Sequence, residues 1–409
     1  MSGMRVLIYG GTFNPPHKGH FLAVSEAMKC LDPEKIFFIP TSIPPHKQLA
    51  DNSPPAEERA EMLNAGFCPL LPGSSVLDLE LKREGKSYTS DTLLSLREQY
   101  PGDELIFLVG TDMFLSLLTW HEPETILSCA GIAVFAREND RTEEITAMAR
   151  RLRTEYGAAV YVIPGRPYEV SSTEVRALLP QRKGRELVPS LVYRYIIRKR
   201  LYGAKPELAW LRSRADSYLK PKRIPHVRGV EETAVKLAGL WGADPGDAAE
   251  AAICHDITKY VDREGQLRLC DKYAIMTDEL ERGSEKLLHA RTGAAFARDL
   301  FGLSDAVTSA IRWHTTGCPD MTTLEKITYL ADYIEPNRAG FDGLEELRRT
   351  CFEDLDRAME LATRMSIDEV SGKGLPCHGN TVACHDWYRQ RLRVRGLEPV
   401  HADGIPDEV

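Results

Sequence analysis

The chain has 409 residues, of which 43% are hydrophobic and 27% charged. This length exceeds one ordinary core, because domains usually contain roughly 100–200 residues, and the composition is that of a globular protein. The formal net charge of -8 argues against a protein that coats nucleic acid, which needs a broad basic face to displace counterions. We therefore expect two or three domains and no nucleic-acid partner, although a local basic patch can still bind a small polyphosphate.

The N-terminal segment and the cysteines indicate the cellular compartment. MSGMRVLIYG has neither a basic region nor the apolar run of a secretory signal, and no apolar segment of the chain is long enough to span a bilayer. The nine cysteines are scattered without a C-x-x-C pair, which fits thiols in a reducing compartment. We expect a cytoplasmic protein with no membrane partner.

Short β-rich runs alternate with amphipathic helical stretches from residue 4 to about 200. The expected strands are RVLIYGG, KIFFIP, SVLDLEL, ELIFLVG, GIAVFA and AVYVIP. The expected helices between them include HFLAVSEAMKCL, AEERAEMLNAGF, SDTLLSLREQY and TEEITAMARRLRTEY. This alternation predicts a Rossmann-like, doubly wound α/β fold with a parallel sheet, in which ligands lie beyond the carboxyl ends of the strands.

After about residue 205 the β-rich runs stop and the pattern becomes helical. The expected helices include VEETAVKLAGLWG, DPGDAAEAAICHDI, SEKLLHARTGAAFARDLFGL, SDAVTSAIRWH and TTLEKITYLADYI. Asp244 and Ser304 are expected N-caps, and Thr322 with Glu325 forms an expected capping box. The second half is therefore predicted to be an all-α bundle.

A basic segment, YRYIIRKRLYGAKPELAWLRSRADSYLKPKR, separates the two halves. Such charge runs usually form solvated helix faces, and Gly203 with Pro206 suggests a boundary. We predict one domain over residues 1–203, a second over 204–394 and a flexible tail over 395–409.

The first candidate site is RVLIYGGTFNPPHKGH. Gly10 and Gly11 follow an apolar run, where the missing Cβ atoms let the backbone turn and approach a ligand closely. A helix that begins near His17 places His17 and His20 on one face of its first turn. Unpaired N–H groups and the positive end of the dipole at that helix start favour an anion such as a polyphosphate.

A second element, VSSTEVRALL, stands near the end of the same predicted domain. Ser171 and Glu174 form an expected capping box, which by itself indicates only a well-started helix. The functional interpretation adds a second helix start aimed at phosphates, with Arg176 holding the β- and γ-phosphates.

The two elements resemble the T/H-x-G-H nucleotidylyltransferase superfamily, through GGTFNPPHKGH and SSTEVR. The segments between them resemble its bacterial nicotinate-nucleotide adenylyltransferase family, through IPTSIPPHK, SYTSDTL, FLVGTDMFLSLLTWHEPETIL and GIAVFAR. The resemblance implies catalytic roles for His17, His20 and Arg176. The ATP site that it implies comprises Gly10, Gly11, Thr12, Phe13, His17, His20, Lys47, Gly110, Asp112, Arg137, Ser171, Ser172 and Arg176. It implies contacts of the nicotinate nucleotide with His46, Thr89 and Trp120, and places His46 and Lys47 near the phosphates.

The implied reaction joins ATP, carried with Mg²⁺, to nicotinate mononucleotide and releases pyrophosphate. Asn14 departs from the common family spelling, in which an Asp is often found, so any role of that carboxylate is in doubt. Nicotinamide mononucleotide and pantetheine phosphate remain alternative acceptors.

The second candidate site is scattered over the helical half. His255 and Asp256 are adjacent, and four further candidate ligands fall in separate helical patterns: His226, His289, His314 and Asp332. Imidazole and carboxylate groups on facing helices are what a helical bundle uses to bind metal.

The order H…HD…H…H…D resembles that of the HD-domain metallophosphohydrolases. The local sequences resemble the HD-domain family of symmetrical bis(5′-nucleosyl)-tetraphosphatases, through IPHVRGV, CHDITKY, LLHARTGA, WHTTG and LADYIEPNR. The resemblance implies an HD-domain helical bundle over 204–394 and two metal ions, of iron or a similar metal, held by those six residues and bridged by a catalytic Asp256. The implied substrate is diadenosine tetraphosphate. Lys259 and Arg338 are candidates to hold its phosphates.

Other interpretations of the second half stay open. It could act on other nucleotides as a phosphatase or pyrophosphatase, or serve as a nucleotide-sensing regulatory module. Cys377, His378, Cys384 and His385 lack the usual zinc-finger spacing, so we expect them to be packing residues. The sequence leaves open whether the chain forms a homo-oligomer.

Overall fold

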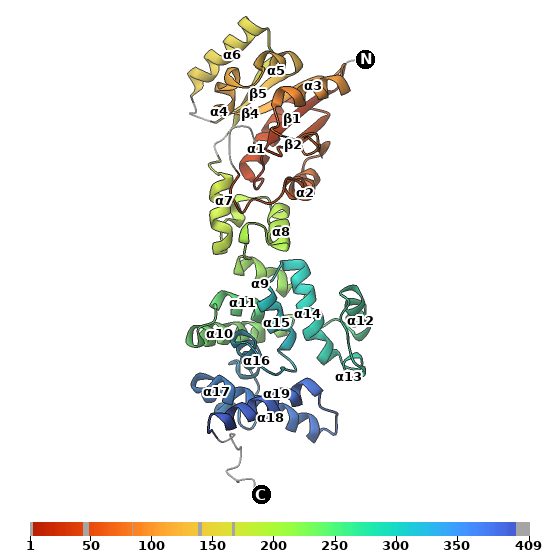
Figure 1. The fold of residues 1–409 in the computed structure, drawn as a ribbon, viewed down its shortest axis with the longest axis vertical. Helices are drawn as coiled ribbons and strands as arrows, with labels where there is room; N and C mark the ends of the chain where they lie inside the picture. Colours follow the sequence, from red (N-terminus) through yellow and green to blue (C-terminus); the bar gives the residue numbers. More distant parts are fainter. Residues whose placement is uncertain (1–2, 44–48, 84, 138–140, 166–167, 398–409) are drawn as a thin grey trace, which may run out of the picture. The chain divides into compact units, whose positions relative to one another are not determined.

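The computed structural model describes residues 3–43, 49–83, 85–137, 141–165 and 168–397, with only the backbone of residue 137. The chain divides into two compact units, Met1–Lys205 and Pro206–Val409. The first contains a sheet with helices, and the second is helical throughout its described part (Figure 1). None of the helices in the described ranges is long and apolar enough to cross a membrane.

The first unit is built on a parallel sheet of six described strands in the order β3-β2-β1-β4-β5-β6. The strands are β1 (Arg5–Gly11), β2 (Lys35–Pro40), β3 (Ser74–Val76), β4 (Glu104–Gly110), β5 (Gly131–Arg137) and β6 (Val160–Gly165). This is the doubly wound order, in which the chain changes direction between β1 and β4. The predicted Rossmann-like fold class is confirmed.

Helices cover both faces of this sheet because its central strands are apolar on both sides. The helices are α1 (Lys18–Leu31), α2 (Ala56–Gly66), α3 (Thr89–Gln99), α4 (Thr111–Leu115), α5 (Pro123–Cys129), α6 (Thr142–Tyr156), α7 (Ser172–Leu178) and α8 (Ser190–Lys199). One face packs its side chains against apolar residues of α3, α4, α5 and α6. Helices α1 and α2 contact other parts of the sheet.

Two local expectations differ from the structure. The predicted strand SVLDLEL pairs with β2 only over Ser74–Val76. It ends early because the chain turns to bury Glu80, which accepts a hydrogen bond from the Thr92 hydroxyl at 3.0 Å. Gly10 and Gly11 do not form a turn, since they are the last two residues of β1.

The second unit is a bundle of helices. They are α9 (Leu208–Asp216), α10 (Ile224–Trp241), α11 (Pro245–Cys254), α12 (Arg263–Lys272), α13 (Glu279–Arg282), α14 (Glu285–Phe301), α15 (Asp305–Trp313), α16 (Thr323–Ile334), α17 (Leu344–Glu353), α18 (Leu355–Gly372) and α19 (Gly379–Val394). The predicted caps are present, since Asp244, Ser304 and Thr322 each accept a backbone N–H of the following helix. A core of alanine, leucine, isoleucine and aromatic side chains holds the bundle together.

Candidate functional sites

A pocket of about 560 Å³, here called the first pocket, opens beyond the carboxyl ends of β1 and β4. Tyr9 and Thr12 line it from the end of β1, and Leu108 to Gly110 line it from β4. This is the topological switch point of the sheet, where open α/β folds bind their ligands. The first pocket therefore occupies the position at which the sequence predicts a nucleotide.

His17 and His20 lie together at the start of α1 and line this pocket. The His17 backbone N–H donates to His20 Nδ1 at 3.2 Å, and the two rings stack with centroids 3.7 Å apart. His20 in its neutral form therefore carries its hydrogen on Nε2. Burial and the charge of His17 hold the pKa of His20 well below its ordinary value, so its imidazole is a neutral donor at pH 7.

Gly19, between these histidines, lies where a side chain would have little room. A Cβ atom there would lie 3.1 Å from the His17 ring and 3.1 Å from Val170 Cγ1. Real Cβ atoms seldom approach so closely, and Val170 belongs to the segment that leads into α7. The glycine lets the segment before α7 pack directly against the first turn of α1.

The two predicted motifs of the first unit meet in the structure. Ser171 caps α7, accepting the Glu174 N–H at 3.1 Å, and Ser171 and Ser172 line the first pocket. Ser172 Oγ donates to the carbonyl of Pro15 at 2.9 Å. Arg176 Nη1 donates to the carbonyl of Asn14 at 2.5 Å, so this guanidinium holds the loop before α1.

The other predicted nucleotide residues fall into three groups. Thr12, Gly110 and Asp112 line the first pocket, and Phe13 is fully buried beside His20 with ring centroids 5.2 Å apart. Two of the three nicotinate candidates lie apart from that lining, with Thr89 at the first position of α3 and Trp120 packed edge-on against Phe107. The third group, His46, Lys47 and the side chain of Arg137, lies outside the described residues.

Sequence reasoning missed Arg59, which is 1% exposed. Its guanidinium donates to the carbonyls of Thr12 at 2.5 Å, Thr41 at 2.8 Å and Ser42 at 3.2 Å. It thereby joins the segments that follow β1 and β2, next to the first pocket. The pattern of α2 gave one signal, because Arg59 stands between apolar positions on the buried face of that helix.

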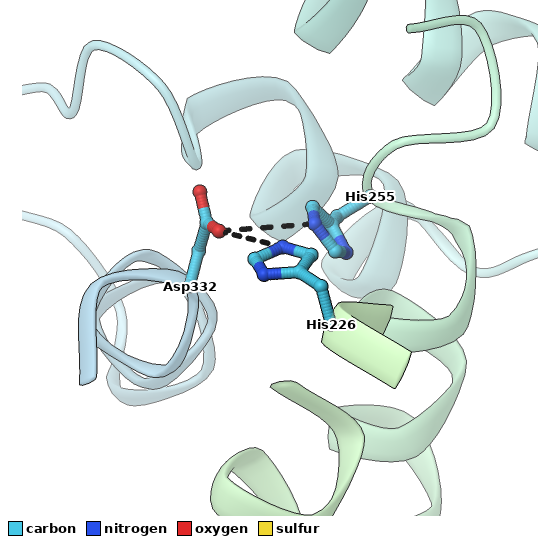
Figure 2. A group of neighbouring side chains, drawn as sticks. All are labelled: His226, His255 and Asp332. Carbon is cyan, nitrogen blue, oxygen red and sulfur yellow. Dashed lines mark ion pairs between the residues drawn. The ribbon is translucent and has the colours of Figure 1, made fainter. Parts of the chain in front are cut away.

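In the second unit, the six predicted ligands converge from separate helices. His226 comes from α10, His289 from α14 and Asp332 from α16, while His255 and Asp256 follow α11. His314 ends α15. Figure 2 shows Asp332 facing His226 and His255 across the space between these helices.

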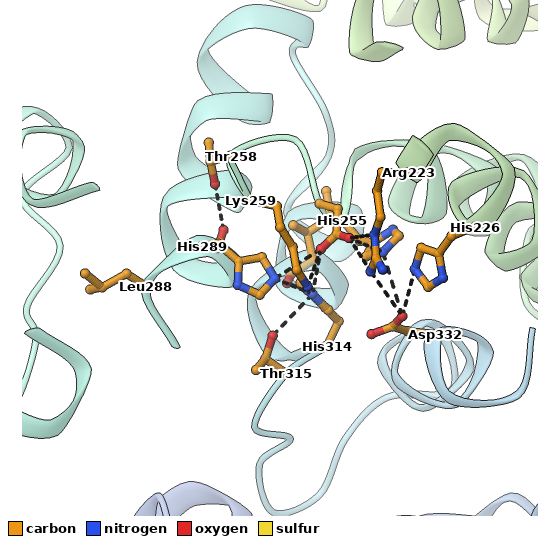
Figure 3. A network of polar contacts seen from close by, with 12 residues as sticks. Arg223, His226, His255, Thr258, Lys259, Leu288, His289, His314, Thr315 and Asp332 are labelled. Atoms are coloured by element: carbon orange, nitrogen blue, oxygen red, sulfur yellow. Dashed lines mark hydrogen bonds and ion pairs between the residues drawn. The ribbon is translucent and has the colours of Figure 1, made fainter. Parts of the chain in front are cut away.

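Their potential ligand atoms form two adjacent groups, each with atoms within 4.8 Å of one another: His226, His255 and Asp332, and Asp256, His289 and His314. In the first, His226 Nε2 lies 3.0 Å from Asp332 Oδ1. In the second, His289 Nε2 lies 3.1 Å from both Asp256 Oδ1 and His314 Nε2. Asp256 faces both groups, because its Oδ2 lies 3.4 Å from His255 Nε2. Figure 3 shows His314 of the second group beside both His289 and His255.

Hydrogen bonds at the outer ring nitrogens orient three of the imidazoles. His255 and His314 each donate Nδ1–H to a backbone carbonyl at 2.7 Å, and His226 donates Nδ1–H to Glu335 Oε1 at 3.0 Å. Each Nε2 lone pair is therefore left pointing inward, as in protein metal sites. Buried Nε2 atoms of His226 and His255 and buried Oδ1 atoms of both aspartates lack hydrogen-bond partners within the described structure.

The protonation states also suit a metal. Burial alone would raise the pKa of Asp256, but the charges of His255 and Lys259 and the adjacent His289 ring hold it well below its ordinary value. Burial and the charges of His289 and His255 lower the pKa of His314 to about 3. Burial would lower the pKa of His255, but the charge of Asp256 and a hydrogen bond to it raise that pKa above its ordinary value, so His255 would release a proton when a metal ion binds. Ionised carboxylates and neutral imidazoles are the forms that bind metal, so these residues are suited to hold divalent ions.

Two further residues at these groups escaped the sequence analysis. Glu335, 1% exposed, accepts from His226 Nδ1–H, and its position three residues after Asp332 was the available signal. Arg223 Nε donates to Asp256 Oδ2 at 2.6 Å. Arg223 belongs to the basic segment interpreted as solvated surface, and for this residue that interpretation is wrong because its side chain is 21% exposed.

The two predicted phosphate-binding cations lie at the edge of the ligand groups. Lys259 Nζ lies 3.1 Å from Asp256 Oδ1, and Arg338 Nη1 lies 3.7 Å from Asp332 Oδ1. Both line a pocket of about 1070 Å³, the second pocket, together with His289 and His314. Cys384 is fully buried near Gly317 and Met321, as expected of a packing residue.

Comparisons with known proteins divide the chain in the same way. The Cytidylyltransferase-like family matches residues 8–178, and the HD domain family matches residues 223–337. A probable nicotinate-nucleotide adenylyltransferase of Geobacter metallireducens is 36% identical over 49% of this chain and 98% of its own length. A symmetrical bis(5′-nucleosyl)-tetraphosphatase of Halalkalibacterium halodurans is 42% identical over 41% of this chain and 90% of its own length.

Among solved structures, a predicted HD superfamily hydrolase involved in NAD metabolism from Clostridium acetobutylicum is 34% identical, with a TM-score of 0.44. The match covers 46% of this chain and 100% of that protein. By the sequence relatives, the chain belongs to the nicotinate-nucleotide adenylyltransferase family through its first half and to the HD-domain family of symmetrical bis(5′-nucleosyl)-tetraphosphatases through its second half.

Proposed function

We propose that the first unit transfers the adenylyl group of ATP to nicotinate mononucleotide, giving nicotinate adenine dinucleotide and pyrophosphate. The observation that carries this proposal is the first pocket, where His17 and His20 at the start of α1 meet Ser171 and Ser172 at the start of α7. Two helix starts and two imidazoles make a site for a polyphosphate with Mg²⁺. The names of the relatives supply the substrate class.

In this reaction a phosphate oxygen of the acceptor attacks the α-phosphorus of ATP, and pyrophosphate leaves. Nucleotidyl transfer of this kind depends on positioning and on donors that neutralise the developing charge. The neutral His20 would donate from Nε2 to a phosphate oxygen, and Arg176 would keep the loop at Asn14 in place. Thr89 and Trp120 are proposed to contact the nicotinate nucleotide.

The test is dinucleotide synthesis by the parent and by His20→Ala. We expect a loss of about 10²–10³ in kcat, the usual effect of removing one charge-stabilising donor. Nicotinamide mononucleotide and pantetheine phosphate serve as competing acceptors. A higher kcat/KM with either of them would overturn the acceptor assignment and leave the transferase reaction standing.

We propose that the second unit hydrolyses diadenosine tetraphosphate symmetrically at two metal ions. The geometry that supports this is the pair of adjacent ligand groups, with Asp256 facing both through different oxygens. Two metal ions held by the six residues of these groups would supply an activated water and neutralise charge on the phosphates. Lys259 and Arg338, at the edge of the groups, would hold the remaining phosphates. Water adds to one central phosphorus, the central P–O–P bond breaks, and two ADP molecules result.

Product analysis with the metal-loaded parent and Asp256→Ala tests this proposal. We expect the parent to form ADP alone and Asp256→Ala to form no product. Elemental analysis should find two metal ions per chain, and we expect the metal to be iron. ATP with AMP would contradict symmetrical cleavage. Asp256→Ala should synthesise dinucleotide at the parent rate, whereas His20→Ala should keep full hydrolysis, so each variant is the control for the other.

A further inference from the structure

The second pocket contains two kinds of wall. Lys259, Arg338 and the metal-ligand residues form a charged part. Leu280, Leu287, Val370, Leu375 and Pro376 form an apolar part. A nucleotide has the matching chemistry, with anionic phosphates and a flat ring system, and this pocket is as large as typical ligand pockets.

A third group of ionisable side chains, Asp278, Glu281 and His378, stands at this pocket outside the predicted site. Glu281 is fixed, because it accepts the Asp278 N–H at 3.0 Å and pairs with Arg291 at 2.5 Å. Asp278 Oδ1 is also used, since it accepts the Glu281 N–H at 2.8 Å as the N-cap of α13. The other carboxylate oxygen of Asp278, Oδ2, is left to accept a hydrogen bond from a ligand, since the side chain is 60% exposed and lines the pocket.

His378 offers a hydrogen-bond donor beside this acceptor. Its Nδ1 accepts the backbone N–H of Asn380 at 3.1 Å, so the neutral ring carries its hydrogen on Nε2. His378 is 7% exposed, and its Nε2 has no hydrogen-bond partner within the described residues. Asp278 Oδ2 and Glu281 Oε1 both lie 3.5 Å away. A metal ion at Nε2 would need its lone pair and would break the Asn380 bond, so the group is better suited to an organic ligand.

We propose that Asp278 and His378 recognise a nucleobase with an exocyclic amino group next to a ring nitrogen, as in adenine. The amino group would donate to Asp278 Oδ2, and the ring nitrogen would accept from His378 Nε2–H. The rings would pack on the leucine and proline side chains of the apolar wall. This inference rests on the proposed function of the second unit, which places the phosphates at the metal-ligand groups.

Hypoxanthine is the sharpest probe, because it carries a carbonyl oxygen where adenine has the amino group. That oxygen would face the Asp278 carboxylate, and two acceptors cannot bond to each other. The adjacent ring nitrogen of hypoxanthine carries a hydrogen, so it would face His378 Nε2–H as a second donor. We expect the metal-loaded chain to cleave diadenosine tetraphosphate at least about tenfold more efficiently, in kcat/KM, than diinosine tetraphosphate. Asp278→Asn should lower this ratio markedly, because an amide can donate to the carbonyl. The ratio should stay above one, because the ring N–H of hypoxanthine still faces His378 Nε2–H. Asparagine is also a good N-cap, so α13 should remain intact.

Glu279→Gln is the matched control. Glu279 is the neighbouring acidic residue, is exposed and also lines the second pocket. Its substitution removes the same charge from the same turn and should leave the adenine preference unchanged. An equal loss of preference in both variants, or full preference in Asp278→Asn, would overturn the proposal. So would a lower melting temperature of Asp278→Asn with an unchanged ratio, the result expected of a structural role.

A second measurement is independent of hydrolysis. Cys377 lines the same pocket, so a bound base should slow its alkylation, followed by peptide mass spectrometry. Half-protection should need less ADP than IDP in the parent, and the difference should be smaller in Asp278→Asn. If ADP protects preferentially but diadenosine tetraphosphate is not cleaved, the hydrolase proposal fails and base recognition stands. Equal protection by ADP and IDP, or none by either, overturns base recognition whatever the hydrolysis result.

Discussion

The first pocket and the metal-ligand groups both suit phosphate chemistry, but they are built from different parts of the chain. The first pocket relies on backbone groups at two helix starts, with two imidazoles added at α1. The metal-ligand groups rely on six side chains from five helical segments, four of them histidines. Backbone donors contact a phosphate directly, whereas convergent lone pairs need a cation between them.

Metal removal should give the largest difference between the activities of the two sites. Dialysis against a chelator should abolish hydrolysis of diadenosine tetraphosphate, because six ligand side chains, five of them buried, would face one another without a cation. Dinucleotide synthesis should return fully with Mg²⁺ alone. Elemental analysis should confirm that the dialysed protein is metal-free. If that protein still hydrolysed diadenosine tetraphosphate at the parent rate, the contrast between a metal-dependent second site and the first pocket would be wrong.

Glu335→Gln should weaken metal binding by about 10–100-fold, measured by competition with a chromophoric chelator. The substitution removes the negative charge that orients His226 through its Nδ1–H. Glu325→Gln is the control, because Glu325 is a buried glutamate in the first turn of α16, where it closes the capping box with Thr322. Equal losses of affinity in both variants would mean that Glu335 acts only through the stability of the helix.

Arg59→Met should lower kcat/KM for ATP about tenfold or more, since small displacements of a phosphate loop are costly. It should also cost about 1–3 kcal/mol of stability, because three carbonyls lose a donor. Arg97→Met is the matched control: Arg97 donates to the carbonyls of Cys129, Tyr100 and Asp103 near the amino ends of β4 and β5. It should lose similar stability and keep its KM for ATP. If both variants raise this KM alike, Arg59 has no special role at the pocket.

The smallest expected effect is a pH dependence of stability. The pKa of His20 is lowered by folding, so the unfolded chain binds a proton at His20 more readily than the folded chain does. The free energy of unfolding should therefore fall as the pH falls below about 6.5, by at most about 1.4 kcal/mol per pH unit for this group. His20→Asn should make that decline less steep in urea denaturation at several pH values. An unchanged slope would contradict the lowered pKa.

The sequence predicts the fold class and all six members of the metal-ligand groups because those features follow local patterns. Apolar periodicity identifies strands and helices, and each ligand stands in a recognisable helical segment. Arg59 and Glu335 escaped prediction because helix patterns treat charged residues as surface. Their burial depends on segments far away in the sequence, such as the loop at Thr12 above Arg59 and His226 beside Glu335. The early end of β3 likewise depends on the burial of Glu80.

The bonds that close the first pocket span a long stretch of chain. Ser172 reaches Pro15 across 157 positions, and Arg176 reaches Asn14 across 162. Contacts between such distant residues form late, because the entropy of closing the intervening loop must first be overcome. A ribosome must therefore synthesise nearly the whole first unit before this pocket exists, and a nascent chain that stops before α7 should lack nucleotide affinity even with its sheet already formed.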